Sequence, residues 1–176
     1  MAEPALRWFT SPADVDRELH EALIGCWARV SNAGGAVGFP FLPVDEAEVR
    51  GAAGRLVGGL STGRQLLVAT VEDRLAGWLA LTRNDWELTR HWATVTRVQS
   101  DLPHRGQGVG AALMREVARH AREDLGLEQL HLDVRSGLGL EDFYARLGWR
   151  VVGRWPSAMR LAEGDDRDEI LMLLEL

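Results

Sequence analysis

The feature that most constrains the fold of this chain is a glycine-rich segment near its middle, residues 105–110 (RGQGVG), which Ala111 follows. An apolar, β-prone run precedes the segment and an amphipathic helical pattern follows it, so the glycines lie at a strand-to-helix turn. Main-chain N–H groups at such a turn can converge on a phosphate, because glycine has no Cβ atom to hold a bulky anion away. Arg105 adds a planar set of donors that suits phosphate. The segment therefore predicts a site for a charged, phosphate-bearing cofactor.

The length of the chain predicts a single domain over residues 1–176. This length is sufficient for one sizeable core and short for two domains. No apolar run reaches the length of a membrane span, and residues 1–8 lack the basic and apolar blocks of a secretion signal. We therefore expect a cytoplasmic protein with no membrane partner. Cys26 is the only cysteine, which excludes an internal disulfide, and its position in a helical apolar stripe predicts a core side chain.

The charged residues narrow the class of partner. The net charge of −6 argues against nucleic acid, because a phosphate backbone favours an excess of basic side chains, and it suits a cationic substrate. All 20 basic residues are arginine, so Schiff-base chemistry and the lysine-bearing phosphate loop of nucleotide hydrolases are both excluded. His91, His104 and His131 lack the spacing of metal ligands, and we expect no bound metal.

The hydrophobic pattern predicts elements in the order β-α-α-β-β-β, glycine loop, α-β-α-β-β. The expected strands are residues 5–9, 65–71, 75–83, 91–100, 130–134, 150–154 and 169–175. The expected helices run from a Ser11-Pro12 start to residues 32–35, over 45–60, from the glycine loop to about Gly126, and over 140–147. A polar turn at residues 163–167 is expected between the last two strands.

Two motifs in this order resemble the signatures of the GNAT superfamily of acyl-CoA-dependent N-acyltransferases. Residues 105–110 match the cofactor motif Q/R-x-x-G-x-G/A, and residues 143–149 (FYARLGW) match a tyrosine-bearing helix before Leu-Gly-aromatic. The resemblance extends from about residue 5 to the end of the chain. It implies the GNAT fold, an α/β (α+β) structure with a central mixed, mostly antiparallel, twisted sheet of six or seven strands flanked by about four helices.

The resemblance implies an N-acetyltransferase that moves an acetyl group from acetyl-CoA to a primary amine by direct attack in a ternary complex. Residues 132–135 (LDVR) and 147–150 (LGWR) are similar to the acetyltransferases that inactivate tabtoxin, which indicates a small-molecule acceptor. The N–H of Val98 is expected to polarise the thioester carbonyl where the strand bends. The implied cofactor-binding residues are Val98, Ser100, Arg105, Gly106, Gln107, Gly108, Val109 and Gly110.

Two side chains are expected to move protons. Tyr144, the only tyrosine, is implied as the general acid that protonates the departing thiolate. Asp133 is our choice of general base, because some peptide-acetylating relatives carry an acid at the matching place; an ion pair with Arg135 is its alternative role. Many relatives instead carry acids on the strand before the glycine loop, where this chain has Thr96-Arg97.

That departure leaves Asp85 and Glu87, in the loop before this strand, as alternative bases. A second departure is Gly137, which replaces an asparagine that helps to hold the cofactor arm in many members. For the acceptor pocket, the family fold indicates residues 34–41 together with Trp86, Trp92 and Trp155. Some of the seven tryptophans could surround a cationic amine by cation–π contact, although each one alone is better explained as core.

Other functions remain open at this point. Protein or peptide N-terminal acetylation and a non-catalytic acyl-CoA sensor would both use the same cofactor site. An NAD-dependent oxidoreductase is the remaining alternative, because residues 106–111 also satisfy a dinucleotide fingerprint and Asp133 lies about twenty residues further on. Only about forty residues follow Asp133, however, which is too few for the usual further parallel strands. A homodimer and acyl groups longer than acetyl are also open.

Overall fold

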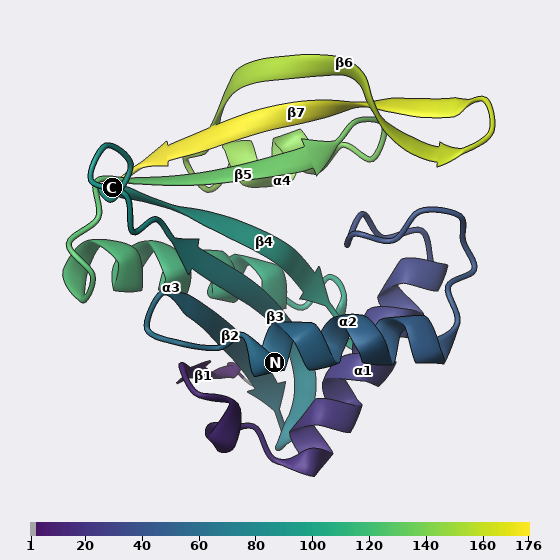
Figure 1. Cartoon of the computed structure of the whole chain (residues 1–176), viewed down its shortest axis with the longest axis horizontal. Helices are drawn as coiled ribbons and strands as arrows, with labels where there is room; N and C mark the ends of the chain where they lie inside the picture. Colours follow the sequence, from purple (N-terminus) through teal and green to yellow (C-terminus); the bar gives the residue numbers. More distant parts are fainter. Residues whose placement is uncertain (1–2) are drawn as a thin grey trace.

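The computed structural model describes residues 3–176, which form a seven-stranded sheet with helices on both faces (Figure 1). The strand order is β1-β2-β3-β4-β5-β7-β6, and only β4 and β5 pair in parallel among these residues. The strands are β1 (Ala5–Phe9), β2 (Arg64–Val71), β3 (Arg74–Arg83), β4 (Trp92–Ser100), β5 (Gln129–Arg135), β6 (Arg150–Ala162) and β7 (Asp165–Glu175). The helices are α1 (Arg17–Asn32), α2 (Glu46–Gly58), α3 (Val109–Glu123) and α4 (Leu140–Ala145). The predicted mixed, mostly antiparallel sheet with four helices is confirmed.

The sheet separates two hydrophobic cores. Side chains alternate along each central strand, so Leu66 and Val68 of β2 pack against α1 and α2, whereas Leu67 and Ala69 pack on the α3 and α4 side. Cys26 is fully buried in the first of these cores, as its stripe predicts. Burial raises the pKa of its thiol to about 12, so the thiolate is absent at neutral pH.

The predicted start of the first helix is wrong by five residues, because Asp16 and not Ser11 is its N-cap. Ser11 caps a separate 3-10 turn over Pro12–Asp14, where its hydroxyl accepts from the N–H of Ala13 at 3.3 Å. Asp16 caps α1, and its carboxylate accepts from the N–H of Leu19 at 2.8 Å. Because the chain carries two capping residues in succession, it forms a short turn before the helix instead of one continuous helix.

The last two strands are longer than predicted. They form a hairpin from Arg150 to Glu175 with its turn at residues 163–164. The predicted strand ends at Arg154, whereas β6 continues past Pro156, because β6 is an edge strand, where a missing N–H leaves no partner unpaired. A register shift between Trp155 and Met159 accommodates the proline, and pairing with β7 resumes beyond it.

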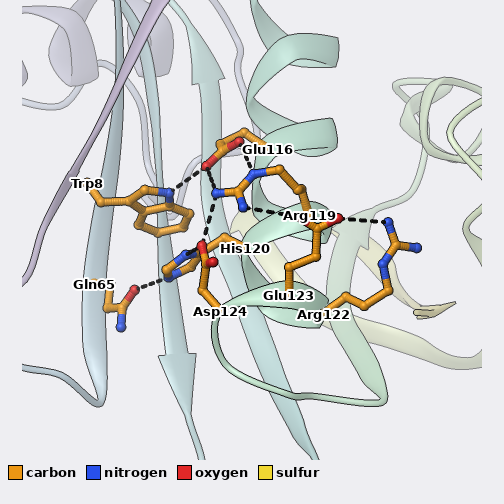
Figure 2. Close-up of polar contacts among 8 residues, drawn as sticks. All are labelled: Trp8, Gln65, Glu116, Arg119, His120, Arg122, Glu123 and Asp124. Carbon is orange, nitrogen blue, oxygen red and sulfur yellow. Dashed lines mark hydrogen bonds and ion pairs between the residues drawn. The ribbon is translucent and has the colours of Figure 1, made fainter.

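A polar cluster attaches β1 to α3 (Figure 2). The indole N–H of Trp8 donates to Glu116 at 2.9 Å, and the Trp8 ring stacks on His120 with 4.2 Å between centroids. Arg119 donates to Glu116 at 2.9 Å and to Asp124 at 3.0 Å. Because Trp8 and Glu116 are 108 positions apart, this cluster holds the first strand to the body of the fold.

The cluster predicts that part of the stability of the protein is lost in acid. Hydrogen bonds from Arg119 and then from Trp8 lower the pKa of the Glu116 carboxyl. The Glu116 carboxylate therefore contributes fully to the free energy of unfolding above its pKa in the unfolded chain, which is about 4.3. This contribution is lost as the pH falls through the lower pKa of the folded state. We expect Glu116→Gln to lower the free energy of unfolding by about 0.5–1.5 kcal/mol at pH 7 and by less at pH 3.

Urea denaturation followed by circular dichroism between pH 3 and 7 measures this difference. The matched control is Glu175→Gln, whose carboxylate forms an exposed ion pair with Arg150 at 3.0 Å and is expected to change stability by less than about 0.5 kcal/mol. Equal destabilisation by Glu116→Gln at both ends of the pH range would contradict the prediction.

Candidate active site

The site is built where the two parallel strands separate. β4 and β5 pair only over Trp92–Thr94 and Gln129–His131, and Figure 1 shows them diverging beyond that point. β4 also contains a bulge, because Trp78 pairs with Gln99 and Ala80 with Thr96, which leaves one residue more on β4 than on β3. Arg97 lies in this bulge with φ of 60°. The bulge takes main-chain groups near Arg97 and Val98 out of the ladder, as expected for a strand that presents an N–H to a ligand.

A cavity of about 560 Å³ lies between the diverging strands and ends at the glycine loop. Gly108 is the N-cap of α3 with φ of 84°, and no side chain caps the helix. Gly106 has φ of 74°, and a Cβ at either glycine would meet nothing within 4 Å, so the loop opens onto free space. The first turn of α3 carries no acidic residue. Uncapped N–H groups at a helix N-terminus suit an anion, so these residues fit the diphosphate of coenzyme A.

The structure brings almost all of the predicted cofactor residues to this cavity. Those that line it are Val98, Ser100, Arg105, Gly106, Gly108, Val109 and Gly110. Gln107 does not line it, because its side-chain amide turns back and donates to the carbonyl of Pro103 at 2.8 Å. The prediction that Gln107 binds the cofactor therefore rests on its main-chain N–H and not on its side chain.

Tyr144 projects from α4 into the same cavity. Its ring packs edge-on against Phe143 and Trp149, with centroids at 5.0 and 6.1 Å. The side chain is 6% exposed, and no residue in 3–176 forms a hydrogen bond with its hydroxyl. Burial, and then the charge of Asp133, raise the pKa of Tyr144 above its usual range. Its hydroxyl is therefore protonated at neutral pH and available to donate.

A second cavity of about 340 Å³ adjoins the first. It lies between the α1–α2 connection and the far end of β6, which contribute Ala36, Gly38, Phe39, Pro40, Met159, Arg160 and Leu161. The residues that line both cavities are Ala36, Val95, Thr96, Arg97 and Asp133. Asp133 therefore lies at the junction, between the cavity that ends at the glycine loop and the cavity beside the α1–α2 connection.

A second carboxyl lies beside Asp133 that the sequence analysis did not identify. Glu169 of β7 pairs in register with Arg135 of β5, two residues from Asp133 on the same face of the sheet. Burial, and then the charge of Asp133, raise the pKa of Glu169. Glu169 could have been identified only from the pairing of β5 with β7, and the sequence pattern does not specify this pairing.

The structure does not place the other candidate bases or the tryptophans at the site. Asp85 and Glu87 line neither cavity. Trp86 and Trp155 are 64% and 58% exposed and lie outside both cavities, and Trp92 stacks on His131 at 4.1 Å. The expected aromatic surround for a cationic amine is therefore not formed by these three side chains. Of the expected acceptor lining, residues 34–40 contribute to the cavities, whereas Phe41 lines neither.

Two features are absent from the described residues. In residues 3–176, no group of three His, Cys, Asp or Glu side chains is arranged to hold a metal ion. No helix in the same range is long and apolar enough to cross a membrane. The fold also excludes the oxidoreductase alternative, because β4 and β5 are the only parallel pair in the described chain and no doubly wound parallel sheet exists.

A mixed sheet that splits between two parallel strands, beside an uncapped helix N-terminus, defines the class of acyl-CoA-dependent N-acyltransferases. The model of the acetyltransferase (GNAT) family matches residues 40–149, and the chain belongs to this family. Acetyl-CoA is the acyl donor of the family. No curated protein matches the chain in sequence.

Solved structures share the fold at low sequence identity. A GNAT-family acetyltransferase from Streptococcus pneumoniae is 19% identical, with a TM-score of 0.72 over 99% of this chain and 100% of the other. The protein yncA from Salmonella typhimurium, solved with its cofactor acetyl-CoA, is 18% identical, with a TM-score of 0.72 over 99% and 95%. A ribosomal-protein-alanine N-acetyltransferase from Brucella melitensis is 19% identical, with a TM-score of 0.72 over 98% and 99%.

Proposed function

We propose that the chain acts as a single N-acetyltransferase domain that moves an acetyl group from acetyl-CoA to a primary amine of a small molecule, by direct attack in a ternary complex. The observation that carries the proposal is the meeting of two cavities at Asp133, one of which ends at the glycine loop. Such an arrangement lets two substrates bind together and brings their reacting atoms to one point. A protein that only sensed acyl-CoA would not need the second cavity.

The cofactor residues would hold the donor through main-chain groups. The N–H groups of residues 105–110 and the Arg105 guanidinium would bind the diphosphate, and Ser100 would meet the pantetheine arm. Acetyl-CoA, when bound, supplies an acetyl group activated as a thioester, so that a nitrogen–carbon bond forms as the carbon–sulfur bond breaks. The N–H of Val98 would donate to the acetyl oxygen from the bulge in β4.

Two side chains then transfer the protons of the reaction. The Asp133 carboxylate takes the proton that the acceptor ammonium must lose before its nitrogen can attack. The Tyr144 hydroxyl gives its proton to the leaving sulfur. We further propose that Glu169, whose pKa is raised by burial and then by the charge of Asp133, shares the proton that Asp133 receives.

A small acceptor is favoured over a peptide by the way the second cavity is bridged. The N–H of Phe41, in the α1–α2 connection, donates to the carbonyl of Leu161 on β6 at 2.9 Å. This bond joins the α1–α2 connection to β6 beside the cavity, and we infer that it favours an acceptor of limited length. Among structural neighbours, a candidate phosphinothricin N-acetyltransferase at 21% identity and the ribosomal-protein-alanine enzyme share the fold equally, so the argument for a small acceptor rests on this chain's own cavity.

Calorimetry with acetyl-CoA, followed by thiol release over a panel of small amines, tests the proposal. We expect saturable binding of acetyl-CoA and release of free thiol that depends on both the amine and the protein. Because Cys26 is buried, its thiol will not react with the reagent that detects the product. Binding without thiol release for any amine would indicate the sensor alternative, and absence of binding would contradict the whole proposal.

A further inference from the structure

The second cavity carries an unbalanced set of charges. Its lining includes the carboxylate of Asp133 and the guanidinium groups of Arg97, Arg135 and Arg160. Arg160 is already neutralised, because it donates to both carboxylate oxygens of Asp166 at 2.7 and 2.8 Å. Arg97 and Arg135 have no ion-pair partner within 4.0 Å among residues 3–176. Two unpaired cations and one carboxylate therefore face the same space.

Arg97 is held in place by its surroundings. It lies in the β4 bulge, and its guanidinium carbon is 5.3 Å from the centroid of the Trp27 ring. A Cβ built on Gly38 would lie 1.9 Å from a terminal nitrogen of Arg97, so the missing side chain at Gly38 provides the space for this guanidinium. Burial lowers the pKa of Arg97 from its usual value, and the charge of Asp133 partly opposes this effect.

Arg135 approaches the cavity from the other side. Its terminal nitrogen donates to the carbonyl of Gly34 at 2.9 Å, which fixes the guanidinium beside the α1–α2 connection. Burial, and then the neighbouring Arg167, lower the pKa of Arg135. Glu169 is its cross-strand neighbour but lies outside ion-pair distance. The remaining donors of this guanidinium are available to a ligand.

We infer that the acceptor carries an anionic group close to its amine, as an α-amino acid does, and that Arg97 and Arg135 bind this group. The inference rests on the proposed function and names its substrate class. The ammonium is placed by the Asp133 carboxylate at the junction, and the carboxylate of the ligand is placed by Arg97, which lines both cavities, and by Arg135, which lines the second cavity alone. A planar guanidinium binds a carboxylate through two parallel hydrogen bonds, which gives both affinity and orientation.

This conclusion differs from the expectation that the net charge suggests. The net charge of −6 favours a cationic substrate when the whole surface is considered. The charge that a bound ligand meets is that of the cavity wall, however, and only Asp133 contributes a negative charge there. A ligand with a positive charge alone would leave both guanidinium groups without an anionic partner.

The test compares acceptors that differ only in the anionic group. The common α-amino acids and their α-carboxamides are assayed for thiol release with saturating acetyl-CoA. The best amino acid is expected to exceed its own carboxamide in kcat/KM by about 10- to 100-fold, mainly through KM. The same acid, and not its carboxamide, is expected to raise the melting temperature of the protein in the presence of coenzyme A.

Arg97→Gln removes the charge and retains most of the side chain. It is expected to lower kcat/KM for the amino acid by about 10- to 100-fold and to change kcat/KM for the carboxamide by less than about 3-fold. The preference for the acid over its carboxamide would then be lost. Arg135→Gln provides a second, independent variant with the same expected direction. Arg150→Gln is the matched control, because Arg150 forms an exposed ion pair with Glu175 and lines neither cavity.

The outcomes separate the inference from the function on which it rests. Equal turnover of acids and carboxamides, or turnover of uncharged amines alone, would overturn the inference and leave the transferase in place. The same would follow if Arg97→Gln and Arg135→Gln lowered both kinds of acceptor equally. Absence of thiol release with every amine in both series would contradict the proposed function, and the inference with it.

Discussion

Replacing Gly108 by leucine is expected to weaken the binding of acetyl-CoA by at least about 100-fold, which corresponds to the loss of two charge-assisted hydrogen bonds. Gly108 caps α3 with φ of 84°, and its missing side chain leaves open the space above the helix N-terminus. A leucine at this position would cover the N–H groups that the proposed site requires and would disfavour the backbone conformation of the loop. Calorimetry with acetyl-CoA measures the loss.

The matched control for this variant is Gly126→Leu. Gly126 also has a positive φ, 64°, and a Cβ there would also meet nothing within 4 Å, but it lies beyond the other end of α3 and outside the cavities. Both variants carry the same backbone strain, whereas only Gly108→Leu obstructs the loop. Unchanged affinity of Gly108→Leu for acetyl-CoA would show that the diphosphate binds elsewhere. Equal losses of affinity in both variants would mean that backbone strain causes the effect.

Tyr144→Phe is expected to lower kcat by about 10- to 1,000-fold, the range that one positioned general acid supplies. The affinity for acetyl-CoA and the melting temperature should change little. The ring of Tyr144 packs against Phe143 and Trp149, and the substitution retains these contacts. The hydroxyl makes no hydrogen bond within residues 3–176, so its removal leaves no protein group without a partner. Steady-state thiol release gives kcat, and calorimetry gives the affinity.

A change of acetyl donor shows whether Tyr144 donates a proton or only shapes the site. If Tyr144 protonates the leaving sulfur, an acetyl thioester whose thiol has a lower pKa needs less help, and the defect of Tyr144→Phe should shrink with that donor. A defect of the same size with both donors would indicate a packing role. Unchanged turnover with acetyl-CoA would remove Tyr144 from the mechanism.

The parts of the fold that depend on local sequence were predictable. The glycine loop, the amphipathic stripe of α3 and the central strands have patterns set by a single face or a single turn, and the structure places them within a few residues of the prediction. The prediction ends this strand at residue 154, whereas the position of β6 at the edge of the sheet allows it to continue past Pro156.

The site was predictable where a motif specifies it and not where distant strands meet. The glycine loop and Tyr144 belong to motifs, and both line the first cavity. Arg97 was noted only as a departure from the family pattern, and Glu169 was missed. Their roles depend on a bulge in β4 and on the pairing of β5 with β7, which bring residues 97, 133 and 169 to one place. The number of tryptophans was also a poor guide to the acceptor pocket, because Trp86 and Trp155 lie outside both cavities.

The central claim is that main-chain amides of the glycine loop hold the diphosphate of coenzyme A at the start of α3. A crystal structure of the protein with coenzyme A tests this claim most directly. The account predicts diphosphate oxygens at about 3 Å from the N–H groups of residues 106–110, with the sulfur between β4 and β5 near Tyr144. Coenzyme A bound at another surface, or a loop left empty at a saturating concentration, would contradict it.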